Sequence, residues 1–381
     1  MIERIGVIGG GQLGRMLTEA ALPLGFDVTV LEAGENCPAA QVGARQLQGE
    51  IKDGNAIADL VMQSDITTWE IEHIDTHALE VLALKGQNIQ PAPETLFIIK
   101  DKYNQHLFLE GKGIPVARSV SLGRGLEKGE AVASDVNLAN ARALFDDRLI
   151  IKSRFGGYDG RGNLRYNGES AEELEDILGH DLYAEQVVDF SKELAVIAAR
   201  DTAGRSATFP TVETVHENNI CHTVTMPADI DPRLNAAAQE VAHETLKHLG
   251  GAGIFAIEMF ALEDTVIVNE IAPRVHNSGH LTIEANETSQ FEQHIRAITG
   301  MPLGSTAMRA PAAVMVNILG TRDERLSREG LEKVLALPDT HPHFYGKNPR
   351  PARKIGHITV LGASREKALR TARWAREALA V

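Results

Sequence analysis

The chain has few cysteines and no long apolar segment, and each shortage excludes a class of protein. Two cysteines in 381 residues, Cys37 and Cys221, cannot build a disulfide framework or a four-cysteine zinc site, so a reducing compartment is expected. No apolar run approaches the roughly 18 residues of a membrane-spanning helix. No cleavable leader precedes the first strand pattern either, so the cytoplasm is the expected location.

Basic residues are also in deficit, with 38 Lys and Arg against 52 Asp and Glu and a net charge of −14. A nucleic-acid-binding surface needs an extended basic footprint, so nucleic acid is not an expected partner. Any phosphate must therefore be bound by a local group of basic residues. The 43% hydrophobic and 24% charged content are typical of a globular protein, and the length allows two or three domains.

The hydrophobic pattern predicts three domains of mixed α/β and α+β class. Residues 1–100 begin with strand, glycine turn, helix and strand, which is typical of a Rossmann-like parallel sheet. Residues 101–300 alternate less regularly and predict an α+β domain with an antiparallel sheet, and residues 301–381 form a small C-terminal domain. Beyond residue 100, strands are expected at 149–152, 182–188, 194–200 and 312–319, and helices at 101–113, 235–249, 323–335 and 365–379.

A hairpin in the second domain faces two carboxylates at each other. If Glu263, Asp264 and Thr265 form a three-residue turn, the pairing register places Glu258 directly opposite Glu270. Like charges at a cross-strand spacing of about 4.5–5.5 Å destabilise a sheet unless something compensates them. Mg²⁺ would compensate, and it completes its coordination with water and substrate phosphates. The alternative is a solvated face on an edge hairpin.

A dense polar run follows this hairpin and favours the functional interpretation. It contains Arg274, His276, Asn277, Ser278 and His280 within seven positions, more polar chemistry than a structural hairpin needs. The pair and the run together predict a site for a metal, a nucleoside triphosphate and a second substrate.

Two glycine-rich turns are candidate phosphate sites. Gly9, Gly11 and Gly14 have the dinucleotide spacing between a strand and a helix, with Glu32 at the end of the next strand, so a nicotinamide enzyme is one alternative. The second turn, residues 152–162, suits a flap whose backbone amides close over phosphates beside Lys152. A long flexible hairpin is the alternative there.

Several of these motifs together resemble the ATP-grasp superfamily. They are Lys152 with its glycine loop, residues 185–188, Glu193, Glu258 and the pair Asn269 and Glu270. Within that superfamily, residues 9–17, 156–162, 269–280 and 345–357 are similar to the N5-carboxyaminoimidazole ribonucleotide synthetases. The resemblance implies a pre-ATP-grasp domain, a central ATP-grasp domain with the flap, and a C-terminal domain that completes the ribonucleotide site.

The resemblance also implies which residues bind which ligand. The magnesium ligands would be Glu258 and Glu270. The ATP site would comprise Lys102, Lys152, Gly157, Tyr158, Asp159, Gly160, Arg161, Gly162, Asn163, Glu185, Gln186, Val187, Val188, Glu193, His216, Asn269 and Glu270. The 5-aminoimidazole ribonucleotide would contact Glu70 or Glu72, Tyr158, Asp159, Arg161, Arg274, His276 and Asn277, and its phosphate would meet Lys347, Arg353 and Lys354.

The implied reaction joins ATP, bicarbonate and the ribonucleotide in purine biosynthesis. Bicarbonate would be phosphorylated to carboxyphosphate, and the exocyclic amine would then capture the carboxyl carbon. Arg274 is expected to contact the phosphoryl group because its planar fork matches an oxyanion bidentately. His276 and Asp159 are alternative acceptors of the amine proton, and a homodimer is implied. Two alternatives remain open, a formate-dependent glycinamide ribonucleotide ligase and a dehydrogenase or nucleotide sensor.

Overall fold

The computed structural model describes residues 2–124, 132–157, 162–320 and 327–379. Its first sheet is parallel, with strand order β3-β2-β1-β4. The strands are β1 (Arg4–Ile8), β2 (Asp27–Glu32), β3 (Arg45–Gln48) and β4 (Ile66–Trp69), and the helices beside them are α1 (Gln12–Ala21), α2 (Gly54–Gln63) and α3 (Thr76–Leu84). The predicted parallel sheet is therefore confirmed, although β3, α2 and α3 were not predicted.

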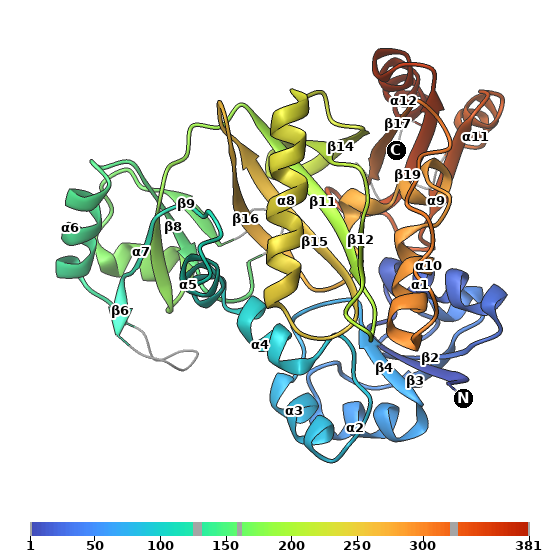
Figure 1. The fold of residues 1–381 in the computed structure, drawn as a ribbon, viewed down its shortest axis with the longest axis horizontal. Helices are drawn as coiled ribbons and strands as arrows, with labels where there is room; N and C mark the ends of the chain where they lie inside the picture. Colours follow the sequence, from blue (N-terminus) through green and yellow to red (C-terminus); the bar gives the residue numbers. More distant parts are fainter. Residues whose placement is uncertain (1, 125–131, 158–161, 321–326, 380–381) are drawn as a thin grey trace.

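A small antiparallel sheet forms a separate lobe, on the left in Figure 1. Its strand order is β5-β10-β8-β9. The strands are β5 (Ser119–Ser121), β8 (Leu149–Ser153), β9 (Asn163–Arg165) and β10 (Leu182–Gln186), and α6 (Asp135–Leu144) and α7 (Ala171–Leu178) pack on them. A two-stranded ribbon, β6 (Gly123–Arg124) with β7 (Val132–Ala133), lies at its margin.

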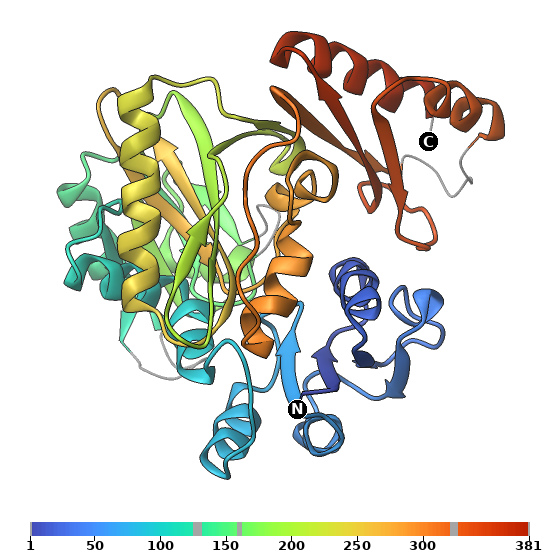
Figure 2. The ribbon, with the colours of Figure 1, turned by 45° about the vertical axis from the view of Figure 1, so that its right-hand side comes forward.

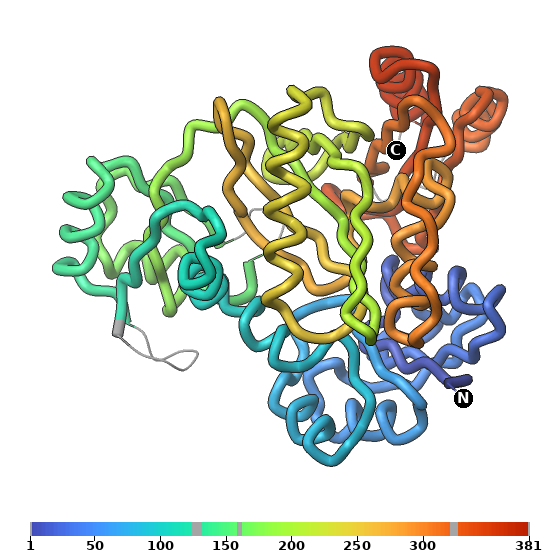
Figure 3. The backbone as a smooth tube through the Cα atoms, viewed as in Figure 1, coloured from blue at the N-terminus to red at the C-terminus, as the bar shows by residue number. Residues whose placement is uncertain are grey.

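Helices α4 (Pro93–Lys100) and α5 (Lys102–Gly111) connect the first sheet to this lobe. The continuous tube in Figure 3 shows the chain running from the first domain through α4 and α5 into the lobe. Asp101 separates the two helices and caps α5, because its carboxylate accepts from the N–H groups of Tyr103 and Asn104. The same carboxylate pairs with Arg154, so the start of α5 is fixed to the end of β8.

The central sheet has nine strands, eight of them in the order β16-β15-β11-β13-β14-β17-β19-β18, while β12 pairs with β11. Its bounds are β11 (Lys192–Arg200), β12 (Ser206–Thr208), β13 (Val212–Glu217), β14 (Ile220–Met226), β15 (Gly253–Ala261), β16 (Val266–Ala272), β17 (Ala312–Leu319), β18 (Thr340–Phe344) and β19 (Lys354–Gly362). The antiparallel sheet predicted for the second domain is confirmed. Because β14 pairs with β17, the C-terminal strands continue this sheet.

Helices cover both faces of the central sheet. Helix α8 (Pro232–His248) crosses the β11 and β15 end, and α10 (Gln290–Thr299) contacts the same strands and α1. The short elements η3 (Asn277–Gly279) and α9 (Thr282–Ala285) precede α10. In Figure 2, α12 (Arg365–Leu379) and α11 (Arg328–Leu335) lie with the C-terminal strands, at a distance from the parallel sheet.

The elements observed beyond residue 230 differ in part from those predicted. The helix predicted at 235–249 begins earlier, at Pro232, because Asp231 caps it and proline is favoured at the first helical position. Of the helix predicted at 323–335, the structure describes α11 from Arg328, and residues 321–326 lie outside the described residues. Strands β18 and β19 were not predicted. None of the helices described in the structure is long and apolar enough to cross a membrane.

Candidate active site

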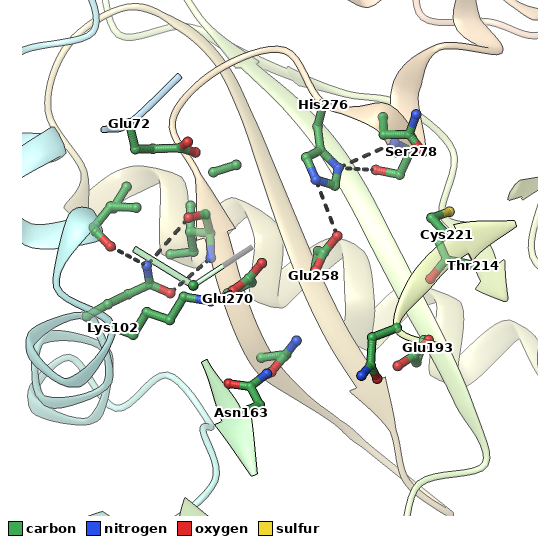
Figure 4. A pocket seen from close by; sticks show the side chains of 18 of the residues that line it. Glu72, Lys102, Asn163, Glu193, Thr214, Cys221, Glu258, Glu270, His276 and Ser278 are labelled. Atoms are coloured by element: carbon green, nitrogen blue, oxygen red, sulfur yellow. Dashed lines mark hydrogen bonds and ion pairs between the residues drawn. The ribbon is translucent and has the colours of Figure 1, made fainter. Parts of the chain in front are cut away.

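The main pocket lies where the small lobe faces the β15–β16 end of the central sheet. Figure 4 shows Asn163 of the small lobe and the charged side chains of Lys102, Glu258 and Glu270 directed into it. Its polar lining includes Glu72, His73, Lys100, Lys102, Gln105, Lys152, Asn163, Glu193, Thr214, His216, Asn219, Glu258, Asn269, Glu270, Arg274, His276, Asn277, Ser278 and Lys354. Loop glycines Gly156 and Gly157 and the strand residues Met259 and Phe260 also line it.

The two carboxylates predicted to face each other do so. Glu258 on β15 is the cross-strand partner of Glu270 on β16, which confirms the pairing. The predicted turn is wrong, because β15 ends at Ala261 and β16 begins at Val266, which leaves four residues between them. A bulge opposite Glu258 and Met259 accommodates Asn269 and shifts the register by one residue.

The electrostatics of this pair are those of a cation site. The pKa of Glu258 is raised to about 7, because burial disfavours its charged form and the charge of Glu270 adds to that effect. Burial acts on Glu270 too, but Lys102, with its Nζ 2.6 Å from Oε2, outweighs it and holds the pKa of Glu270 at about 2. One carboxylate is thus charged at neutral pH, and its partner titrates there.

The residues present fit a magnesium ion. Two facing carboxylates match the small number of protein ligands that Mg²⁺ takes when phosphates and water complete its octahedron. Among the described residues no cluster of three or more His, Cys, Asp or Glu is arranged to hold a metal by itself. The donor set at Glu258 and Glu270 therefore suits a metal that arrives with a nucleotide.

Magnesium affinity is expected to fall as the pH drops below about 7. A proton on Glu258 must leave before the carboxylate can bind the metal, so acid competes with Mg²⁺ by up to about tenfold per pH unit. Calorimetric titration of Mg²⁺ into the ADP-bound protein from about pH 5.5 to about 8 measures this slope. Glu258→Gln should bind Mg²⁺ more weakly and with a smaller slope. An equal slope in the variant would show that another group carries the proton.

Lys152 enters the pocket from the end of β8 and is held there by Glu185. Its Nζ lies 2.8 Å from Oε1 of Glu185, whose other oxygen lies 3.3 Å from Nε2 of His106. Glu185 is buried beneath Lys152 and is not among the pocket-lining residues. Its side chain supports Lys152, and its contact with ATP stays a prediction.

Residues 185–188 are predicted to lie in the ATP site, where backbone N–H and C=O groups at the end of β10 could meet an adenine. The N–H of Gln186 donates to the carbonyl of Arg118 at 2.9 Å, and the N–H of Val187 donates to that of Arg148 at 2.9 Å. These two N–H groups are therefore paired within the protein, and the predicted ATP contacts of Gln186 and Val187 would have to use their other groups. Val188 lies just beyond them, and its role in ATP binding stays a prediction.

Glu193 and His216 form a charged pair on the adjacent strands β11 and β13. The imidazole Nδ1 of His216 is hydrogen-bonded to the Glu193 carboxylate. Burial lowers the pKa of His216, but contacts with Cys221 and Glu193 outweigh burial and raise it to about 10. A protonated His216 is thus a cation in the wall of the pocket. Thr214 lies on the same strand as His216 and also lines the pocket.

The glycine-rich flap connects β8 and β9, and its described ends line the pocket. Gly157 and Asn163 line the pocket from its two ends, and Gly162 has φ of +84°, a conformation that favours glycine. Tyr158, Asp159, Gly160 and Arg161 lie outside the described residues, so their predicted contacts with ATP and the ribonucleotide stay predictions.

Of the two acidic residues predicted for the ribonucleotide site, the structure places Glu72 in the pocket. Its Oε1 lies 2.8 Å from Nε of Arg274, and both side chains are largely buried. Glu70 instead accepts hydrogen bonds from the N–H groups of Gly11 and Gly14 at the start of α1. Gly10 donates to Glu32 in the same way. Carboxylates of the chain itself therefore occupy amides that a dinucleotide phosphate would use.

His276 is neutral and directs a donor into the pocket. Burial lowers its pKa to about 3, and Arg274 contributes to the shift. The backbone N–H of Ser278 donates to Nδ1 of His276 at 3.4 Å, and the Ser278 hydroxyl lies 2.8 Å from the same nitrogen. A backbone N–H can only donate and a hydroxyl can also donate, so both contacts favour the tautomer with the ring proton on Nε2. That Nε2 lies 3.5 Å from Oε1 of Glu258. Figure 4 marks this contact with a dashed line. In this tautomer His276 donates toward the pocket and is not placed to accept a proton through Nε2.

The predicted phosphate ligands lie in the β18–β19 connection and the start of β19. Lys354 lines the pocket, and Lys347 donates to the side chain of Gln12 at the N-terminus of α1. Arg353 is hydrogen-bonded to the carbonyl of Asn348. Burial lowers the pKa of Lys347, and the charges of Arg353 and Lys354 lower it further, so the three basic groups lie within electrostatic reach of one another.

Some pocket residues escaped the sequence reasoning. Phe260 lies two positions after Glu258 on β15, so strand alternation could have placed it on the same face. It stacks on Phe190, with ring centroids 4.4 Å apart. Thr214 had no sequence signal of its own, because it reaches the pocket through strand pairing with distant parts of the chain.

Comparison with known proteins agrees with this arrangement. Residues 2–100 match the ribonucleotide synthetase preATP-grasp domain, residues 120–291 the ATP-grasp domain, and residues 313–371 the phosphoribosylaminoimidazole carboxylase C-terminal domain. A phosphoribosylaminoimidazole carboxylase of Ogataea methanolica is 43% identical over 95% of the chain and 67% of its own length. The chain thus spans about two thirds of such fungal and plant carboxylases.

Relatives of similar length carry a different name. The N5-carboxyaminoimidazole ribonucleotide synthase of Synechococcus elongatus is 37% identical, covering 94% of the chain and 89% of its own length. The solved Thermotoga maritima synthetase is 42% identical with a TM-score of 0.86, over 99% and 98% of the two chains. An Aspergillus clavatus enzyme solved with ADP and the aminoimidazole ribonucleotide is 35% identical with a TM-score of 0.87, over 100% and 99%. The chain belongs to the N5-carboxyaminoimidazole ribonucleotide synthetase family of ATP-grasp enzymes.

Proposed function

We propose that the protein uses ATP to carboxylate 5-aminoimidazole ribonucleotide with bicarbonate, giving N5-carboxyaminoimidazole ribonucleotide, ADP and phosphate. The observation that carries the proposal is that one pocket contains both halves of the site. The carboxylate pair Glu258 and Glu270 lies beside the polar segment of Arg274, His276 and Asn277. A nucleotide with its metal and a second anionic substrate can therefore meet there.

Lys102, Lys152 and Arg274 supply the charge for phosphoryl transfer. This reaction depends mainly on positioning and on neutralising the charge that develops on the transferred group. Lys102 and Lys152 are themselves positioned by Glu270 and Glu185. Arg274 is oriented by Glu72 and can present its remaining N–H groups to bicarbonate or the phosphoryl group. Glu258 and Glu270 would hold the magnesium ion, which would supply positive charge that neutralises part of the phosphate charge.

The second step joins the carboxyl carbon to the exocyclic amine of the ribonucleotide. Whether carboxyphosphate or carbon dioxide released from it is attacked, the reactive species must be kept from water, which is the role we assign to the flap between β8 and β9. His276 orients a substrate group as a donor through Nε2. Asp159 then becomes the acceptor that we favour for the amine proton.

The division into residues 1–100, 101–300 and 301–381 is part of this proposal. The ATP site would lie between the small lobe and the central sheet, and the ribonucleotide site would extend toward Gln12 and Lys354. A homodimer and a cytoplasmic location also remain predictions. Light scattering after size-exclusion chromatography would measure the molar mass in solution, and a monomeric mass would contradict the predicted homodimer.

Lys347→Ala is expected to raise the KM for the ribonucleotide about 10- to 100-fold, because a charged hydrogen-bonding group is lost at the phosphate. Affinity for ATP should be nearly unchanged, since Lys347 lies beside Gln12 and not among the residues of the nucleotide side. Steady-state kinetics with each substrate varied in turn measures both. Lys333→Ala, at an exposed ion pair on α11, is the control. Loss of ATP affinity alone would mean that Lys347 serves the other substrate.

The proposal is tested by asking which compounds ADP formation requires. Rapid ADP release should need bicarbonate, Mg²⁺ and the ribonucleotide together. ATP hydrolysis that is indifferent to the ribonucleotide would contradict the proposal, and tight NADH binding without ATP binding would indicate a dehydrogenase-like protein.

A further inference from the structure

The segment His276–Asn277, which lines the pocket, is held from two sides by carboxamide side chains. Gln290 approaches it from the first turn of α10, and Asn317 approaches it from β17 in the C-terminal part of the central sheet. Both carboxamides are completely buried and belong to elements distant in sequence from each other and from the nucleotide side of the pocket.

Gln290 grips the backbone of His276 with both ends of its carboxamide. Its Oε1 accepts from the N–H of His276 at 2.9 Å, and its Nε2 donates to the carbonyl of His276 at 2.7 Å. The backbone N–H of Gln290 is fixed in turn by the hydroxyl of Thr282 at 2.8 Å. A Cβ added to Gly279 would lie 2.4 Å from Oε1 of Gln290, so the backbone at Gly279 approaches this carboxamide too closely for a larger residue to fit without a shift.

Asn317 makes a reciprocal pair with the side chain of Asn277. The Nδ2 of Asn277 donates to Oδ1 of Asn317 at 3.0 Å, and the Nδ2 of Asn317 donates to Oδ1 of Asn277 at 2.8 Å. The same Nδ2 of Asn317 also donates to the backbone carbonyl of Cys221 at 2.8 Å.

This third bond fixes which way both amides point. A backbone carbonyl accepts only, so the NH₂ group of Asn317 must face Cys221, and its Oδ1 must face the NH₂ group of Asn277. Asn277 is thereby left with one N–H and one lone pair in a defined arrangement for a ligand in the pocket. A freely rotating amide could present them in the opposite order.

We propose that Gln290 and Asn317 are positioning residues that set how tightly and in which orientation the ribonucleotide binds. Gln290 sets the path of the backbone at His276, and Asn317 sets the amide orientation of Asn277. Neither residue lines the pocket, so both act through the residues they hold. This inference rests on the proposed function, because it assigns His276 and Asn277 to the ribonucleotide.

The chain contains a matched control on the same helix. Gln293 is also completely buried in α10, and its carboxamide grips the backbone of Gly304 in the same two-ended way. Its Oε1 accepts from the N–H of Gly304 at 2.7 Å, and its Nε2 donates to the carbonyl at 3.0 Å. Gly304 is not part of the pocket. A variant of Gln293 therefore carries a similar structural cost without the proposed effect.

The experiment compares Gln290→Glu with Gln293→Glu, since each change replaces the NH₂ donor by an oxygen facing a carbonyl. Both should lower the Tm to a similar extent. Gln290→Glu should also raise the KM for the ribonucleotide, and its Kd measured by calorimetry without ATP, about tenfold or more. The KM for ATP should change less than about twofold in both variants. Equal KM and Kd values for the ribonucleotide in the two variants would overturn the proposal.

Asn317→Ser provides the second variant if Gln290→Glu does not fold. It removes the reciprocal amide pair but leaves a small polar side chain at a buried position of β17. The expected result is again weaker ribonucleotide binding with unchanged ATP constants, and unchanged ribonucleotide binding in a folded variant would count against the role of Asn317. Failure of the wild-type protein to bind the ribonucleotide would instead refute the proposed function.

Discussion

Replacing Glu270 by glutamine should lower kcat/KM by about three orders of magnitude while the protein still folds. The change removes the carboxylate that faces Glu258 and that accepts from Lys102 at 2.6 Å. A neutral amide is a poorer magnesium ligand and no longer fixes the lysine, so metal and phosphates are both misplaced. Steady-state rates over a series of Mg²⁺ concentrations measure the loss, which excess metal should restore only in part.

Glu263→Gln is the appropriate control, since Glu263 lies in the exposed connection of the same hairpin. It should leave both the rate and the Mg²⁺ dependence close to those of the unmodified protein. If Glu270→Gln kept an unchanged Mg²⁺ dependence, the facing carboxylates would not be the metal site. Circular dichroism of both variants shows whether the fold is retained.

Arg274→Lys should lower kcat by about two to three orders of magnitude even though the positive charge is kept. Nε of Arg274 lies 2.8 Å from Oε1 of Glu72, and this ion pair orients the guanidinium group inside the pocket. An ammonium group cannot reproduce two parallel hydrogen bonds to an oxyanion. The kcat effect should therefore exceed the effect on the KM for ATP, as measured by initial rates with saturating ribonucleotide.

Arg296→Lys tests whether any arginine in an ion pair would behave in this way. Arg296 pairs with Glu292 on α10, outside the pocket, and its replacement should leave kcat within about twofold of normal. A near-normal kcat in Arg274→Lys would mean that Arg274 supplies only a point charge. Its contact with the transferred group would then have to be assigned to another residue.

The carboxylate pair could be predicted because it depends on local pairing within one hairpin. The predicted turn is one residue shorter than the observed connection, but the bulge at Asn269 compensates for that difference, so Glu258 and Glu270 are still paired. A bulge leaves no clear signal in a short hydrophobic pattern. The prediction of facing carboxylates was therefore correct, although the path to it was not.

The roles of Glu185 and Glu70 could not be predicted in the same way, because they depend on partners far away in the sequence. Glu185 supports Lys152 from 33 positions downstream. Glu70 accepts from the N–H groups of Gly11 and Gly14 in the first glycine turn, which lie 59 and 56 positions earlier in the sequence. The glycine spacing indicates a turn that can approach an anion, but it does not reveal that the anion is a side chain of the same protein.

The way in which the C-terminal strands join the central sheet could not be predicted from the sequence. Its strand β17 was predicted, but its pairing with β14 across more than 80 residues of chain cannot be read from the alternation of side chains. That pairing brings Asn317 next to Asn277 and Lys354 to the pocket. The sequence motifs thus identify the groups of the site, and the long-range pairing explains how they meet.

The central claim is tested most directly by following labelled bicarbonate. Incubation of the protein with ATP, Mg²⁺, ¹³C-bicarbonate and 5-aminoimidazole ribonucleotide should transfer the label to the exocyclic nitrogen of the ribonucleotide, with one ADP formed per carboxylate. Carbon NMR of the fresh mixture should show a carbamate signal coupled to the appearance of ADP. Label that stays in bicarbonate while ATP is hydrolysed, or incorporation of formate into glycinamide ribonucleotide instead, would contradict the account.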